Sequence, residues 1–139
     1  MRPATRHKSG HNRQGAAAVE FAIIAPIFFM LAIGFMELGR GLMVQQVLTN
    51  ASRVGAREAI SLHTSQSQVV TAATDYATGV SVSGVTAVVS PDPAGASAGD
   101  QITVTVSVPY ENISWVPAPW FMGETTLQAE SVMRKEGFE

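Results

Sequence analysis

The sequence predicts an α+β protein in which a long N-terminal transmembrane helix continues into a small domain with a short helix and a three-stranded antiparallel sheet. Three observations lead to this fold class. An apolar run occupies residues 16–36, helical spacing of apolar side chains follows it, and alternation typical of strands starts at residue 80. The 139 residues are enough for one domain beside the membrane segment.

The apolar run is long enough to cross a bilayer. It reads AAAVEFAIIAPIFFMLAIGFM and holds one charged residue, Glu20. As a helix these 21 residues would extend about 31 Å, close to the ~30 Å hydrocarbon core of a membrane. A buried core helix is the alternative, but the rest of the chain offers no second apolar layer large enough to cover it. Residues 16–36 are therefore predicted to form a transmembrane helix.

The charges on the two sides of this run differ in sign. The charged residues before Ala16 are all basic, namely Arg2, Arg6, Lys8 and Arg13, whereas all eleven acidic residues follow Ala16. Basic residues beside a first apolar segment keep that flank in the cytoplasm. We therefore expect residues 1–15 to be a basic cytoplasmic leader and residues 37–139 to be an extracytoplasmic domain of a single-pass protein in the bacterial inner (cytoplasmic) membrane. Topology explains the basic leader better than nucleic-acid binding does, so no nucleic-acid partner is expected.

The junction between leader and apolar run indicates processing. The run ends in FMELGRGLMV without the small-residue cleavage site of a secretory signal, and it is longer than the apolar part of such signals. The junction itself resembles the prepilin-peptidase signal, with Gly15 before the cut, Ala16 after it, Glu20 in fifth place and the aromatic Phe21 in sixth. This resemblance implies cleavage after Gly15. A carboxylate inside a membrane is costly, so we expect Glu20 to pair with the new amino group of Ala16, its own or a neighbour's.

Four features within residues 13–60 resemble the start of TadE-like proteins, which are pseudopilins of tight-adherence (Flp-type) pilus systems. They are the G-AAAVEF junction, Pro26 inside the apolar run, Glu37-Leu38-Gly39-Arg40 at its end, and the segment NASRVGAR that follows. The resemblance implies a pilin-like fold and a role as a minor pilin or pseudopilin-like component of the pilus or of a related secretion apparatus. It also implies as partners the membrane, a prepilin peptidase, other pilin-like subunits and pilus assembly proteins.

Residues 37–60 are predicted to continue the helix beyond the membrane. Glu37 and Arg40 are spaced three apart and can pair at the membrane exit. Ala51, Gly55 and Ala59 are spaced four apart and form a stripe of small residues on one helix face. Such a stripe lets another element approach closely, and the sequence leaves open whether that element is this protein's own sheet or another subunit.

The remaining chain is predicted to form one short helix and three strands. Residues 66–78 have helical spacing and end at Gly79, and residues 80–90, 102–108 and 125–135 alternate as strands do. Residues 91–100 are predicted to be a loop. The proline-rich segment around Trp115 and Trp120 has three interpretations, which are buried packing, a partner surface and a membrane-interface contact.

No residue pattern predicts catalysis. The chain lacks cysteine, and Gly95-Ala96-Ser97-Ala98-Gly99 matches a hydrolase elbow only in letters because no histidine follows His63. We therefore expect no enzyme activity, cofactor, metal or small-molecule substrate. The alternative to a cleaved pseudopilin is an uncleaved single-pass anchor that carries an extracytoplasmic adhesin or scaffold domain.

Overall fold

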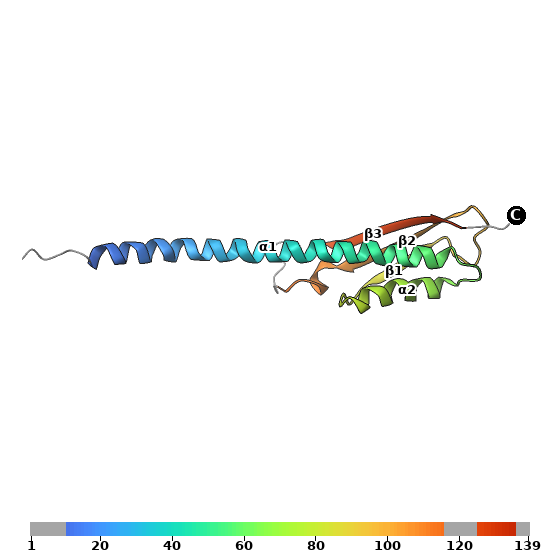
Figure 1. Cartoon of the computed structure of the whole chain (residues 1–139), viewed down its shortest axis with the longest axis horizontal. Coiled ribbons are helices and arrows are strands. Elements are labelled where there is room, and N and C mark those ends of the chain that lie inside the picture. The colour runs from blue at the N-terminus through green and yellow to red at the C-terminus, as the bar shows by residue number, and fades with distance from the viewer. Residues whose placement is uncertain (1–10, 116–124, 136–139) are drawn as a thin grey trace, which may run out of the picture. The chain divides into compact units, whose positions relative to one another are not determined.

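The computed structural model describes residues 11–115 and 125–135. Its elements are a long helix, a shorter helix, three strands and one 3-10 turn (Figure 1). In chain order they are α1 (His11–Ala59), α2 (Gln66–Gly79), β1 (Thr86–Ser90), β2 (Gln101–Pro109), η1 (Tyr110–Asn112) and β3 (Thr126–Arg134). The strands form one antiparallel sheet, so the predicted α+β fold class is confirmed.

The chain divides into two compact units, one up to Met36 and the other from Glu37 onward. In the first unit, the described chain is the initial part of α1. This helix is long and apolar enough to cross a membrane, and no residue of its most apolar stretch is buried. Pro26 lies inside it and lacks the N–H that would bond the carbonyl of Ala22. Residues 1–10 of the predicted leader lie outside the described part of the chain.

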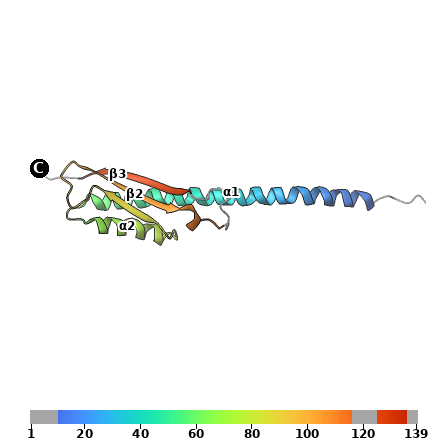
Figure 2. The same ribbon diagram turned by 180° about the vertical axis from the view of Figure 1, so that it is seen from behind.

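The second unit packs the last part of α1 and the whole of α2 against one face of the sheet, as the front and rear views agree (Figures 1 and 2). β2 is the central strand, because Val106 faces Ala87 of β1 and Ala129 of β3. Every second residue of β2 is fully buried, namely Ile102, Val104, Val106 and Val108. The alternation predicted for this strand is therefore confirmed, and its apolar face forms the centre of the core.

The prediction of a strand over residues 80–90 is wrong in its first half. β1 begins only at Thr86, because residues 80–82 close the C-terminus of α2. Ser81 adopts a left-handed φ of 65°, and its N–H donates to the Thr78 carbonyl at 2.9 Å. The N–H of Val82 donates to the Ala77 carbonyl at 2.9 Å, and the Val82 side chain is buried. This Schellman pattern uses the alternating Val-Ser segment as a cap, and Gly79 belongs to the helix.

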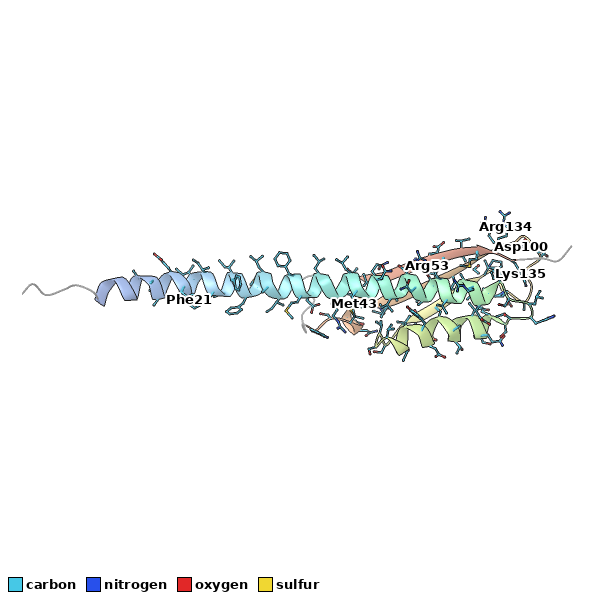
Figure 3. The ribbon with its side chains drawn as sticks, in the orientation of Figure 1. Phe21, Met43, Arg53, Asp100, Arg134 and Lys135 are labelled. Atoms are coloured by element: carbon cyan, nitrogen blue, oxygen red, sulfur yellow. The ribbon has the colours of Figure 1, made fainter. Side chains whose placement is uncertain are left out.

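The loop predicted at residues 91–100 is confirmed and is closed by its own aspartates. The Asp92 carboxylate accepts from the Ala94 N–H at 3.0 Å, and the Asp100 carboxylate accepts from the Ser97 N–H at 2.8 Å. Lys135 exchanges backbone hydrogen bonds with this loop at Gly99 and Asp100, each at 2.9 Å. Figure 3 shows Asp100 and Lys135 at the same end of the sheet. The serine of the GASAG segment therefore lies in a small-residue loop.

Candidate functional site

The residues of the predicted cleavage and assembly signal lie in the first unit, on the surface of α1. Gly15, Ala16 and Glu20 are exposed. Phe21, which is labelled in Figure 3, is 70% exposed. A Cβ at Gly15 would meet nothing within 4 Å. The Gly15–Ala16 bond is inside the helix, so a peptidase would have to unwind one turn to bind it as an extended chain. Cleavage and the pairing of Glu20 stay predictions.

A buried carboxylate marks the first turn of the second unit. Glu37 is 7% exposed, and its two carboxylate oxygens accept hydrogen bonds from the segment that follows β2. One oxygen accepts from the Ser114 hydroxyl at 3.0 Å and lies 3.2 Å from the Tyr110 hydroxyl. The other accepts from the backbone N–H of Trp115 at 3.1 Å. Glu37 therefore ties residues 110–115 to α1.

Arg40 holds the same segment from one turn further along α1. Its Nε donates to the backbone carbonyl of Ile113, and its guanidinium carbon lies 4.6 Å from the centre of the Trp115 ring. That distance is within the range of a cation–π contact. Trp115 is nevertheless 68% exposed, so its indole is held in place without being buried. The direct Glu37–Arg40 pair expected at the membrane exit stays a prediction.

Tyr110 also contacts α1, at Glu37 and Gly41. Its hydroxyl lies 3.1 Å from the backbone carbonyl of Glu37, and its ring reaches to 3.4 Å from the place a Cβ would take at Gly41. Burial is the main cause that raises the pKa of the Tyr110 hydroxyl, and the hydrogen bond to the Glu37 carboxylate and its negative charge raise it further. Arg40 opposes that shift. Tyr110 is therefore held as a neutral donor.

We call these four residues, Glu37, Arg40, Tyr110 and Trp115, the exit cluster. Sequence reasoning singled out its helical half, because Glu37 and Arg40 are the charges at the end of an apolar run. It missed Tyr110, and it left the place of Trp115 open. The two halves are at least 70 residues apart in the chain, and no local pattern joins them.

The stripe of small residues faces the protein's own core. Ala51 and Ala59 are fully buried. A Cβ at Gly55 would lie 3.0 Å from a methyl of Val104 and 3.2 Å from the Cβ of Ala73. Gly55 thus allows the close approach of α1 to both β2 and α2. Contact of this stripe with another subunit stays a prediction.

Two polar contacts tie α1 to β3 beside the stripe. The Ser52 hydroxyl, which is fully buried, lies 2.8 Å from the Ser131 hydroxyl. The Gln45 side-chain amide donates to the backbone carbonyl of Gln128 at 2.8 Å. These hydrogen bonds fix how α1 lies against β3.

Nothing in the geometry of the described residues points to catalysis. Residues 11–115 and 125–135 hold no group of three His, Cys, Asp or Glu side chains that could bind a metal ion. The side chains that do converge, in the exit cluster, fasten two segments of backbone together. Trp120 lies outside the described residues, so the Trp115–Trp120 segment is placed only at its first residue.

Comparison with known proteins finds one family for the N-terminal part of the chain. Residues 15–57 match the family model of TadE-like proteins, which confirms the resemblance found in the sequence. No curated protein and no solved structure gave a significant match to the chain. The family is structural and pilus-associated, so the match indicates a component related to the tight-adherence pilus with a candidate membrane helix.

Proposed function

We propose that the chain is a minor pilin or pseudopilin-like structural component of a tight-adherence (Flp-type) pilus or of a related secretion apparatus. In this proposal a prepilin peptidase cuts it after Gly15, and the mature protein assembles through its N-terminal helix. The observation that carries the proposal is the family match, which begins at Gly15 and runs through the apolar segment to Arg57. The matched stretch therefore starts at the residue before the proposed cut.

Cleavage after Gly15 would provide the charged group through which subunits assemble. Cleavage would create a positive α-amino group at Ala16, and Glu20 lies four residues further along α1, on the same helix face. Attraction between the two charges is strong in a membrane, where water does not screen it. An amino group of one subunit and a Glu20 of the next would then draw two helices into register.

The topology belongs to the same proposal. The basic leader would stay on the cytoplasmic side of the inner membrane, where the peptidase acts, and residues 37–139 would lie outside it. Support comes from the charge difference across the apolar run and from the exposed apolar surface of α1 before Glu37.

Processing can be tested in cells that contain an active prepilin peptidase. We expect the intact mass and N-terminal sequence of the membrane-extracted protein to show a chain that starts at Ala16. Gly15→Leu should block the cut, because a large side chain replaces the residue next to the scissile bond. Gly10→Leu, a matched change in the leader, should leave processing intact. Recovery of the whole leader on the unmodified protein would contradict the proposal.

The uncleaved anchor with an adhesin or scaffold domain is the second candidate. The position of the Gly15–Ala16 bond within α1 favours it, since a continuous helix is a ready-made anchor. The two candidates differ at Glu20. We expect Glu20→Ala to abolish assembly in a pilus-producing strain while membrane extraction stays normal. Normal pili with that variant would favour the uncleaved anchor.

A further inference from the structure

The exit cluster lies where the apolar run ends, and its exposed indole is a side chain that suits the boundary between bilayer and water. Glu37 follows directly after Met36, the last residue of the run. The backbone N–H of Trp115 donates to the Glu37 carboxylate, and the Arg40 guanidinium lies over one face of the Trp115 ring. A tryptophan combines an apolar body with a polar N–H, and it concentrates at the boundary between bilayer and water.

The helix rise places this cluster at the depth of lipid headgroups. Residues 37–40 advance from about 1.5 to about 6 Å beyond Met36 along a helix axis perpendicular to the membrane. Each headgroup layer is about 5–7 Å thick, from the difference between the full bilayer and its hydrocarbon core. If the apolar run fills the hydrocarbon core, then Glu37 and Arg40 lie within this layer. Trp115, which both residues hold, is at the same level.

We propose that Trp115 is a membrane-interface anchor, clamped to α1 by Glu37 and Arg40, that sets the depth at which the second unit leaves the bilayer. The occupant of this surface is the phospholipid headgroup layer. The inference rests on the proposed function only in requiring that residues 16–36 span a membrane. It does not depend on cleavage after Gly15 or on assembly.

The neighbouring exposed surface of α1 agrees with this assignment. Leu38 and Leu42 are 51% and 65% exposed, and both lie within two turns after Met36. Apolar side chains at that height are favourable in the boundary layer and unfavourable in water. The clamp explains how an exposed indole keeps a fixed place, since its backbone and its ring face are both held.

Fluorescence quenching in vesicles tests the depth of Trp115. The full chain with Trp120→Phe, so that Trp115 is the single tryptophan, is reconstituted into phosphatidylcholine vesicles with either a headgroup nitroxide or a nitroxide deep in the acyl chain. We expect the headgroup label to quench Trp115 severalfold more than the deep label does. We also expect blue-shifted emission and protection from aqueous acrylamide.

A second reporter gives the matched control. Leu62→Trp, combined with Trp115→Phe and Trp120→Phe, places the indole at a 59% exposed site after the end of α1. The helix from Met36 to Ala59 advances about 34 Å, so this reporter should be open to acrylamide and insensitive to both labels. Equal quenching of the two reporters by the headgroup label would overturn the inference.

The clamp itself is tested with Glu37→Ala in the Trp120→Phe protein. This change removes the acceptor of the Trp115 backbone N–H. Quenching by the headgroup label should therefore fall, while circular dichroism shows a folded chain. Glu130→Ala, on the exposed face of β3, is the control and should change neither the headgroup quenching nor the circular dichroism. Unchanged quenching in a folded Glu37→Ala protein would overturn the role of Glu37 in setting the depth.

Vesicle flotation after alkaline extraction separates the two proposals. Protein that floats while Trp115 stays open to acrylamide would overturn the anchor and leave the proposed function standing. An indole shielded from acrylamide but insensitive to both labels would indicate cover by a second copy of the chain, which also overturns the anchor. Protein that does not float would overturn both proposals.

Discussion

At Glu37, burial of a carboxylate is offset by hydrogen bonds from three different residues. Transfer of a lone carboxylate out of water costs several kcal/mol, and each hydrogen bond to a charged group returns about 1.5–3 kcal/mol. Tyr110, Ser114 and Trp115 supply these bonds. Since all three lie in one short segment after β2, the residue that needs partners also determines where that segment lies.

The raised pKa of Tyr110 makes the stability of the second unit depend on alkaline pH. A tyrosine whose folded pKa exceeds its ordinary value of about 10 stabilises the fold below that pH, and the contribution is lost as pH rises through the folded pKa. We expect the urea midpoint of the full chain in detergent to fall as the pH is raised from about 9, below the ordinary tyrosine pKa, to values above about 10. Tyr110→Phe should be less stable at pH 9 and should lose less over this interval. An equal loss in both proteins would contradict the prediction.

At the scale of elements, the backbone at the C-terminus of α2 is strained at one residue, and a substitution can relieve that strain. Ser81 occupies the left-handed region at φ 65°, which costs an L-residue about 1–2 kcal/mol. Ser81→Gly removes that cost but adds freedom to the unfolded chain, so we expect a net gain of about 0.5–1 kcal/mol in the free energy of unfolding. Urea denaturation of the full chain in detergent measures it.

The neighbouring serine supplies the control for this cap. Ser83 lacks a positive φ, so Ser83→Gly should lower the free energy of unfolding by about 0.4–1 kcal/mol. Changes of the same sign in both variants would show that the Ser81 conformation is not strained.

The packing of α1 on the sheet depends on Gly55. A leucine there would meet Val104 and Ala73 at once, so Gly55→Leu should destabilise the protein by about 1–3 kcal/mol or more. Gly39→Leu is the matched change on an exposed part of the same helix, where a Cβ meets nothing within 4 Å. Gly39→Leu should raise the free energy of unfolding by up to about 1 kcal/mol, because leucine has a higher helix propensity than glycine. Destabilisation by Gly39→Leu alone, in urea unfolding of the full chain, would contradict this account.

For the whole molecule, the division at Met36 separates an exposed apolar helix from a unit with its own core. The buried apolar side chains of the described residues all lie between Val44 and Ala129. We therefore expect a chain of residues 37–139 to fold in water without detergent. Its cooperative unfolding, followed by circular dichroism, should have the midpoint of the full chain in detergent. Aggregation or gradual unfolding would show that the membrane helix is needed for the fold.

How far the sequence predicts this protein depends on the range of the interactions. The apolar run, the alternation in β2 and the spacing of residues 66–78 are local patterns, and the structure has a helix, a strand and a helix at these places. The Val-Ser alternation after Gly79 also looked like a strand, but the backbone N–H groups of Ser81 and Val82 cap α2, and the Val82 side chain is buried. The alternation alone did not distinguish these outcomes, since in the cap only Val82 is buried and Val80 stays 43% exposed.

The sequence by itself determined the order of the elements, the candidate membrane helix and the Gly15–Phe21 junction, because each is written in neighbouring residues. The tertiary structure alone decided that Glu37 and Arg40 hold Trp115, and that Gly55 faces Val104 and Ala73. These contacts join residues far apart in the chain. Hydrogen bonds and close packing form between them only after the sheet has folded against α1, so no stretch of sequence records them.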